Sequence, residues 1–469
     1  MAQSANTEDY ANGACMEQQF RGAVERAGGG LVSSFEKFRN EVESFFKANM
    51  KQMERRRVTI KKAFFKFINE AFADDIPAKL NTTVMSHEEN SEAGVLMEEL
   101  VKSHGYKAES HAVVTTDGYV LIVHRILPAT LNESATKSGI VLLHHGLFGS
   151  SEDWVLLGPK KSLPYLLVNA HYDVWLTNAR GNKYSKAHMS RTMTDDEFWN
   201  FSWHEIGQFD LSAVIDYIRE QNDKDQPLHY VGHSMGATAL LALLSTYPTY
   251  NQVLKSAVLL APLAFMYEVK GPIRLLAEFY NQNTFVSLKF LGAHDFAPLE
   301  YFPRNFIEKF CKGTKIMCLN PLLLLANGGR EIANKTLRQN ILNRVPAGGS
   351  MKTIIHYIQL VKSGQFQMFD MGRSQNLKKY GRVAPPIYRL NDVTLPVAIF
   401  SSSDDWLSTI PDIQSLLSNI LNPVIHHVIK RHEFSHTDFV WAEDADVLVY
   451  YLILDVLKQI TEGRNDKNM

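Results

Sequence analysis

The chain contains the stretch Leu228-His229-Tyr230-Val231-Gly232-His233-Ser234-Met235-Gly236-Ala237-Thr238-Ala239-Leu240. An apolar run leads into Gly-x-Ser-x-Gly, and residues typical of a helix start follow. This pattern predicts a strand that turns sharply into a helix, with glycine required at Gly232 and Gly236 because the turn leaves no space for side chains. The serine of such a turn adopts a strained backbone that projects its Oγ, so Ser234 is the candidate nucleophile.

Short apolar runs alternate with helical stretches on both sides of this turn. The runs are Ile140 to Leu143, Tyr172 to Leu176, Leu228 to Val231, Ala257 to Leu260, Val397 to Phe400 and Val424 to Ile429. Two further β-rich runs flank Asp117-Gly118 and predict a hairpin within residues 111–123. Continuous apolar strands separated by helices predict a mostly parallel sheet that is covered on both faces. The fold class is therefore α/β.

The alternation of predicted strands and helices divides the chain into four predicted regions. Residues 91–261 and 391–469 are the two parts of the α/β core. Residues 262–390 between them are rich in leucine and aromatic residues, which indicates a folded insertion and not a loop. Residues 1–90 form an N-terminal extension that precedes the core.

The extension contains two apolar stripes with the helical period, one from Leu31 to Phe45 and one from Ile60 to Ala71. The stripes predict amphipathic helices. Lysine and arginine exceed acidic residues between Phe35 and Glu70, so peripheral contact with a membrane surface is one interpretation. Packing of the helices on each other or on the main domain, and a coiled-coil partner, remain open as well.

Composition excludes several classes of protein. The 469 residues carry 49 basic and 50 acidic side chains, so no overall positive charge favours binding of nucleic acid. Three cysteines are too few for a disulfide-rich scaffold, and their spacing predicts no zinc site. Neither a metal nor a cofactor is expected, and the oligomeric state is open.

No apolar run is long enough to cross a membrane, and residues 1–30 show no signal-peptide pattern.

A serine nucleophile that attacks a carbonyl needs backbone N–H groups that bind the developing oxyanion. One should come from Met235, directly after the serine. The other should come from a loop after an earlier strand, and the loop after Leu143 reads His144-His145-Gly146-Leu147-Phe148-Gly149. Leu147 is the candidate second donor. His145 is expected to shape this loop, and the side chain of His233 is expected to point away from the attack path.

The serine also needs a histidine base and a carboxylate that orients it. In α/β-hydrolases both follow the serine in the chain, on loops after late strands. The first such loop contains Asp404 and Asp405, and the residues alone do not choose between them. The second contains His432 and His436, where the turn into the final helix near Asp438 favours His436.

Several motifs in order resemble the acid lipase family, which includes gastric and lysosomal lipases. The resemblance spans about Val95 to Leu457. It is carried by Thr116-Asp117-Gly118-Tyr119, His145-Gly146-Leu147, Tyr172-Asp173-Val174-Trp175-Leu176, Asn178-Ala179-Arg180-Gly181-Asn182, Gly232-His233-Ser234-Met235-Gly236 and Val361-Lys362-Ser363-Gly364-Gln365-Phe366. The resemblance implies an α/β-hydrolase fold in which residues 262–390 form the cap and lid.

The family motifs also select among the alternatives. The resemblance assigns the acid to Asp405 and the base to His436, and it implies that Cys311 and Cys318 correspond to a bridging pair. In this chain Ser402 and Ser403 replace two glycines that precede the acid in the family.

The function implied is a serine ester hydrolase that forms an acyl-enzyme on Ser234. Its substrates would be neutral lipids, triacylglycerol or sterol ester, at a lipid–water interface. Two alternatives stay open, a catalytically silent lipid carrier on the same fold and a small-molecule carboxylesterase. Family members are secreted or lysosomal, whereas residues 1–90 match nothing in the family.

Overall fold

A computed structural model describes residues 93–130, 138–279, 320–330 and 332–463. These residues belong to one compact unit, built on a nine-stranded sheet in the order β1-β2-β4-β3-β6-β7-β8-β9, with β5 paired to β2. The predicted N-terminal helices and the cysteines Cys15, Cys311 and Cys318 lie outside the described residues, and the predicted domain boundaries remain predictions.

Every predicted strand is present. The strands are β1 (Tyr106–Val114), β2 (Tyr119–Pro128), β3 (Gly139–His144), β4 (Tyr172–Leu176), β5 (Ala187–His188), β6 (Leu228–His233), β7 (Ser256–Leu260), β8 (Val397–Ser402) and β9 (Pro423–Ile429). β1 and β2 form the predicted hairpin, and all pairings from β4 through β3 to β9 are parallel. The prediction of a mostly parallel sheet is confirmed.

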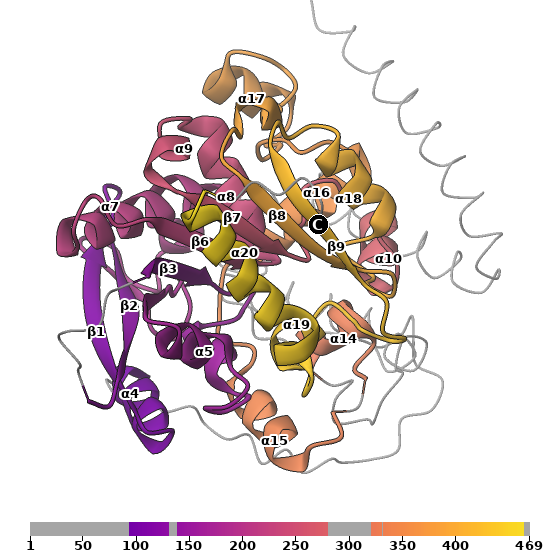
Figure 1. Cartoon of the computed structure of the whole chain (residues 1–469). Helices are drawn as coiled ribbons and strands as arrows, with labels where there is room; N and C mark the ends of the chain where they lie inside the picture. Colours follow the sequence, from indigo (N-terminus) through magenta and orange to yellow (C-terminus); the bar gives the residue numbers. More distant parts are fainter. Residues whose placement is uncertain (1–92, 131–137, 280–319, 331, 464–469) are drawn as a thin grey trace, which may run out of the picture. The chain divides into compact units, whose positions relative to one another are not determined.

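Successive side chains of a strand point to opposite faces of the sheet. In the central strands, both faces are covered by helices. Ile140 and Leu142 of β3 belong to one apolar cluster, together with side chains of α7 (Ser212–Gln221) and α8 (Met235–Thr246). Val141 and Leu143 belong to a second cluster with α5 (Leu163–Asn169) and α20 (Tyr451–Thr461). In Figure 1, α5 and α20 lie on the near side of the sheet. Each large apolar side chain buried in these layers contributes about 1.5–3 kcal/mol.

Helices also fill the described part of the predicted insertion. They are α10 (Pro272–Phe279), α14 (Pro321–Asn327), α15 (Lys335–Arg344), α16 (Met351–Ser363) and α17 (Arg373–Tyr380). α16 is anchored by Ile354, Ile355 and Tyr357, which join the cluster under α8. The insertion therefore packs on the core at α16, whereas α17 stands at the periphery (Figure 1).

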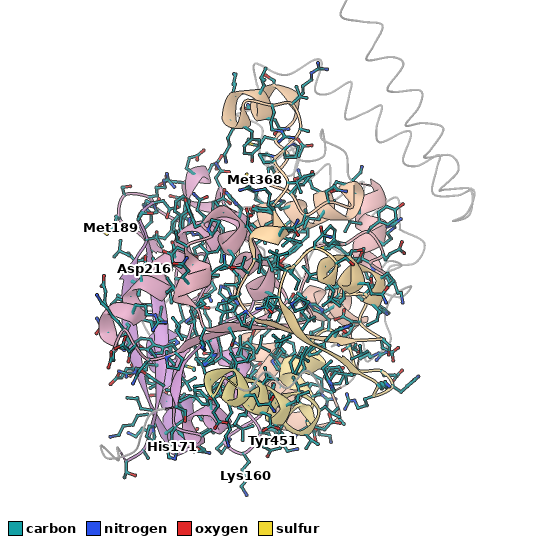
Figure 2. The ribbon with its side chains drawn as sticks, turned by 45° about the horizontal axis from the view of Figure 1, so that its top comes forward. Lys160, His171, Met189, Asp216, Met368 and Tyr451 are labelled. Carbon is teal, nitrogen blue, oxygen red and sulfur yellow. The ribbon has the colours of Figure 1, made fainter. Side chains whose placement is uncertain are left out.

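The remaining helical segments are short or lie at the ends of strands. They are α4 (Ala93–Ser103), η2 (Ser151–Val155), η3 (Asp196–Trp199), α6 (Trp203–Glu205), η4 (Ile206–Leu211), α9 (Tyr250–Val253), η5 (Leu390–Asp392), α18 (Ile410–Leu417), α19 (Asp438–Trp441) and η6 (Asp446–Tyr450). Within the described ranges, no helix has the length and apolar character needed to cross a bilayer. Two of the exposed apolar side chains, Met189 and Tyr451, lie far apart in Figure 2 and do not belong to one patch.

Candidate active site

The turn from β6 into α8 holds Ser234 in the strained conformation that its motif predicts. Ser234 has φ 54° and ψ −112°, a region that residues with a side chain rarely occupy. A Cβ at Gly232 would lie 2.7 Å from the backbone nitrogen of Ala237, and one at Gly236 would lie 2.6 Å from the carbonyl oxygen of His144. The predicted requirement for glycine at both positions is confirmed.

We expect Gly236→Ala to lower both stability and activity. The added methyl group meets the end of β3, and overpacking of a dense core costs about 1–3 kcal/mol. The same contact would push the start of α8 away from the loop after β3. Thermal unfolding and ester hydrolysis measure the two effects, with Ala237→Gly as a control that loses about 1 kcal/mol of helix propensity and leaves the loop in place. Unchanged activity in Gly236→Ala would contradict this account of the turn.

Ser234, His436 and Asp405 lie in one hydrogen-bonded line. The Oγ of Ser234 is 2.7 Å from Nε2 of His436, and Nδ1 of His436 is 2.8 Å from Oδ2 of Asp405. A carboxylate oxygen only accepts, so Nδ1 carries the proton and Nε2 presents its lone pair to the serine hydroxyl. All three side chains are buried. The arrangement can move a proton from the serine to the histidine.

The loop after β8 fixes the carboxylate of Asp405. Its Oδ1 accepts hydrogen bonds from the backbone N–H groups of Leu407 and Ser408, at 2.8 and 2.9 Å. Asp404 is partly exposed and instead accepts from the N–H of Glu433. The structure therefore brings Asp405, and not Asp404, to the histidine.

Ser402, which stands where the family has glycine, connects two loops of the site. Its hydroxyl is fully buried and donates to the carbonyl of Phe434, 2.6 Å away. Phe434 lies on the loop that carries His436, two residues before the histidine. The bond therefore links the acid loop to the histidine loop, and Asp405 reaches its partner despite the serine.

The other histidines considered from the sequence are placed differently. His432 is exposed. His145 uses both ring nitrogens, since Nδ1 donates to the carbonyl of Gly146 and Nε2 accepts from the N–H of Ala179. Nε2 of His233 donates to the backbone carbonyl of His436 at 2.9 Å. Burial lowers the pKa of His145 and of His233 to about 3, so both rings are neutral near pH 7.

The loop after β3 approaches the serine closely at Gly146. A Cβ at Gly146 would lie 2.9 Å from Nδ1 of His233 and 3.4 Å from Cβ of Ser234. Leu147, the next residue, lines the cavity that contains Ser234. Met235 is the first residue of α8, where a backbone N–H has no partner within the helix. Both residues predicted to bind an oxyanion thus lie beside the serine.

Two asparagines that sequence reasoning did not single out hold this loop. The side-chain oxygen of Asn178 accepts from the N–H of Ser151 at 3.0 Å. The amide nitrogen of Asn182 donates to the carbonyl of Gly149 at 3.3 Å and to the oxygen of Asn178 at 3.0 Å. The segment after β4 therefore supports the loop after β3. The Asn-Ala-Arg-Gly-Asn motif could have pointed to these two asparagines, although the sequence does not reveal which groups they bind.

Arg180 anchors the same segment from within the core. Its guanidinium is fully buried and pairs with Asp117 and Asp210, each at 2.6 Å. Its backbone N–H donates to Asp210 at 3.0 Å. Removing one member of such a buried network leaves an unpaired charge and typically costs about 3–5 kcal/mol.

A largely apolar cavity opens beside Ser234. Its described lining consists of Gly146, Leu147, Asp153, His233, Ser234, Leu263, Met266, Ile273, Leu322, Leu325, Ala326, Ile354, Tyr357, Leu407, His436, Thr437, Val440 and Trp441. Helices α10, α14 and α16 contribute much of this surface, so the insertion shapes the cavity. Among the residues that the structure describes, no three His, Cys, Asp or Glu side chains gather as metal ligands.

The fold and this site define an α/β hydrolase, and comparison with known families agrees. A model of the alpha/beta hydrolase fold family matches residues 139–434. A model of a partial alpha/beta-hydrolase lipase region matches residues 97–158. The predicted fold class is confirmed.

Named lipases match most of the chain. Lipase 3 of Drosophila melanogaster is 36% identical over 366 residues, which cover 77% of this chain and 92% of that protein. Gastric triacylglycerol lipase of Bos taurus is 35% identical over 379 residues, with 79% and 93% covered. Lipase member M of Homo sapiens is 34% identical over 385 residues, with 80% and 89% covered. The chain belongs to the acid lipase family of α/β hydrolases, and it is a carboxylic ester hydrolase of the lipase type.

Proposed function

We propose that the protein hydrolyses long-chain neutral lipid esters, triacylglycerols or sterol esters, through an acyl-enzyme on Ser234. The observation that carries the proposal is the line of hydrogen bonds from Ser234 through His436 to Asp405, set in an apolar cavity. A relative named gastric triacylglycerol lipase supports the choice of substrate.

The first half of the proposed reaction forms the acyl-enzyme. Ser234 Oγ attacks the ester carbonyl while Nε2 of His436 takes the hydroxyl proton. The N–H groups of Leu147 and Met235 bind the oxyanion of the tetrahedral intermediate. Its collapse breaks the bond to the alcohol oxygen, which receives the proton from His436. Asp405 stabilises the imidazolium that exists between these two transfers.

The second half releases the fatty acid. Water attacks the acyl carbon, His436 takes a proton from the water, and the same two N–H groups bind the second oxyanion. Collapse breaks the bond to Ser234 Oγ, and His436 returns the proton to the serine. The proton that Ser234 loses leaves with the alcohol, and a proton from the water replaces it, so the enzyme ends the cycle in its starting state.

The lining of the cavity supports a long acyl chain as the bound group. Side chains such as Leu263, Ile273 and Leu325 offer no hydrogen bonds, and burial of a methylene group contributes about 0.8 kcal/mol. Peripheral membrane contact through the helices predicted in residues 1–90 remains a proposal that rests on the sequence.

Hydrolysis of a matched substrate series tests the proposal. The purified protein is assayed on a triacylglycerol, a cholesteryl ester and a short-chain ester, with Ser234→Ala as the blank. We expect serine-dependent turnover of at least one long-chain substrate. Turnover of the short ester alone would favour the small-molecule carboxylesterase, and lipid binding without turnover would favour the carrier.

A further inference from the structure

The side chain of Asn327 joins the insertion to the loop that carries the catalytic histidine. Asn327 is the last residue of α14, and its side chain is buried. Its amide nitrogen donates to Oγ1 of Thr437 at 3.1 Å and to Oγ of Ser435 at 3.4 Å. These two residues directly flank His436, and Figure 1 shows α14 beside α19, which follows the loop. Asn327 therefore bonds both chain neighbours of the base.

Neighbouring groups fix the orientation of this amide. The backbone N–H of Arg330 donates to Oδ1 of Asn327 at 3.3 Å. Only the oxygen of an amide accepts, so the NH₂ group faces the two hydroxyl groups. The hydroxyl of Ser435 donates to Oδ2 of Asp438 at 2.7 Å, which leaves its lone pairs free to accept from Asn327. Each of these groups therefore acts in a role that its chemistry permits.

The same turn of chain supplies a second link to the histidine loop. The guanidinium of Arg330 donates to the backbone carbonyl of Glu433 and lies 3.5 Å from its carboxylate. Glu433 has φ 64°, which is uncommon for a residue other than glycine. Such a conformation persists only where the surroundings hold it. The end of α14 and the turn that follows it thus bind the histidine loop on both sides of His436.

The histidine loop depends on such links for its position. Between the end of β9 at Ile429 and the start of α19 at Asp438 there is neither helix nor strand, so no regular backbone ladder holds His436. Catalytic side chains work only when neighbouring groups keep them within about 0.5 Å of the productive geometry. A displacement of about 1 Å can lower the rate about 100-fold. The residues that hold this loop therefore affect the rate without touching the substrate.

We propose that Asn327 is a positioning residue, which acts through the two neighbours of His436 to hold this base in line with Ser234. The inference rests on the proposed ester hydrolysis and deepens it, because the insertion then supports the reaction as well as the binding of the acyl chain. Leu322 and Leu325 of the same helix line the cavity. α14 thus binds the substrate with one set of side chains and holds the base with another.

The test separates kcat from KM on two soluble esters, p-nitrophenyl butyrate and p-nitrophenyl palmitate. We expect Asn327→Ala to lower kcat about 10-fold on both, because the loop keeps its bonds to His233 and Ser402 and moves by less than 1 Å. KM should stay within about twofold, since no substrate contact is lost. Leu325→Ala should show the opposite split, with KM for the palmitate raised about fivefold, because the cavity loses apolar surface.

A double-mutant cycle shows whether Asn327 acts through Thr437. Thr437→Val keeps the shape of the side chain and removes the hydroxyl that accepts from Asn327. We expect it to lower kcat about 10-fold as well, and Asn327→Ala/Thr437→Val to be within about twofold of either single variant, because all three lack the same bond. Independent losses that multiply to about 100-fold would overturn the proposal.

Asn320→Ala is the matched control for a purely structural role. Asn320 caps the other end of α14, where its Oδ1 accepts from the N–H groups of Leu322 and Leu323 and its NH₂ group donates to the carbonyl of Val345. Loss of this cap should lower Tm by about 2 °C and leave kcat within about twofold. If Asn320→Ala lowered kcat as much as Asn327→Ala does, the cause would be a weakened helix, and the proposal would fail.

A spectroscopic measurement makes the inference independent of the substrate. The Nδ1–H group of His436 donates to Asp405 at 2.8 Å, and a proton in such a bond gives a ¹H resonance far downfield. We expect this resonance to shift or broaden in Asn327→Ala and to be unchanged in Asn320→Ala. Hydrolysis of the butyrate alone by the wild type would refute the long-chain function and leave the effect of Asn327 in place. An unchanged resonance and unchanged kcat in Asn327→Ala would overturn the inference and leave the function in place.

Discussion

Ser234→Ala and His436→Ala are each expected to lower kcat for ester hydrolysis by about 10⁶-fold, because the nucleophile and its base act as one unit. The 2.7 Å contact between Ser234 Oγ and His436 Nε2 places this histidine to take the serine proton. The double variant should be no slower than either single one. Steady-state rates on a soluble ester, with thermal unfolding to show that each variant is folded, measure the effect.

The matched control for this prediction is His432→Ala. His432 lies on the same loop as His436, but its side chain is exposed. We expect this variant to retain wild-type kcat within about twofold, as is usual for surface substitutions with little effect on the fold. An inactive His432→Ala beside an active His436→Ala would overturn the assignment of the base.

The sheet was predictable because its strands are buried on both faces. A run such as Ile140 to Leu143 is apolar at every position only if both sides face a core, as the two apolar clusters of β3 show. The turn at Ser234 was predictable for a steric reason. Gly232 and Gly236 meet backbone atoms at distances that exclude any Cβ, so the motif and the conformation imply each other.

The contacts between loops were not predictable from the residues. Asp404 and Asp405 are adjacent and chemically identical, and the choice depends on backbone N–H groups at Leu407 and Ser408 that fix one of them. The partners of Asn178 and Asn182 follow from how the loops after β3 and β4 fold against each other. No periodic pattern encodes such contacts, which is why only the family resemblance selected the acid in advance.

The environment of Asp405 gives the second large expected effect. In Asp405→Asn the amide oxygen should keep the hydrogen bonds from Leu407 and Ser408, because only an oxygen can accept them. The NH₂ group then faces Nδ1 of His436 and donates to it. The histidine is forced to carry its proton on Nε2, where it can no longer accept from the serine hydroxyl.

We therefore expect Asp405→Asn to lower kcat by about 10⁴-fold, the usual effect of a wrong histidine tautomer in such a triad, with little change in thermal stability. Asp404→Asn is the matched control, since an amide oxygen can still accept from the N–H of Glu433, and it should stay within about twofold of wild type. Rates on a soluble ester, together with the ¹⁵N shifts of the histidine ring, report both the loss and its cause. If the two variants were equally active, the carboxylate that orients His436 would have to be sought elsewhere, because the geometry at Asp405 would then have no catalytic consequence.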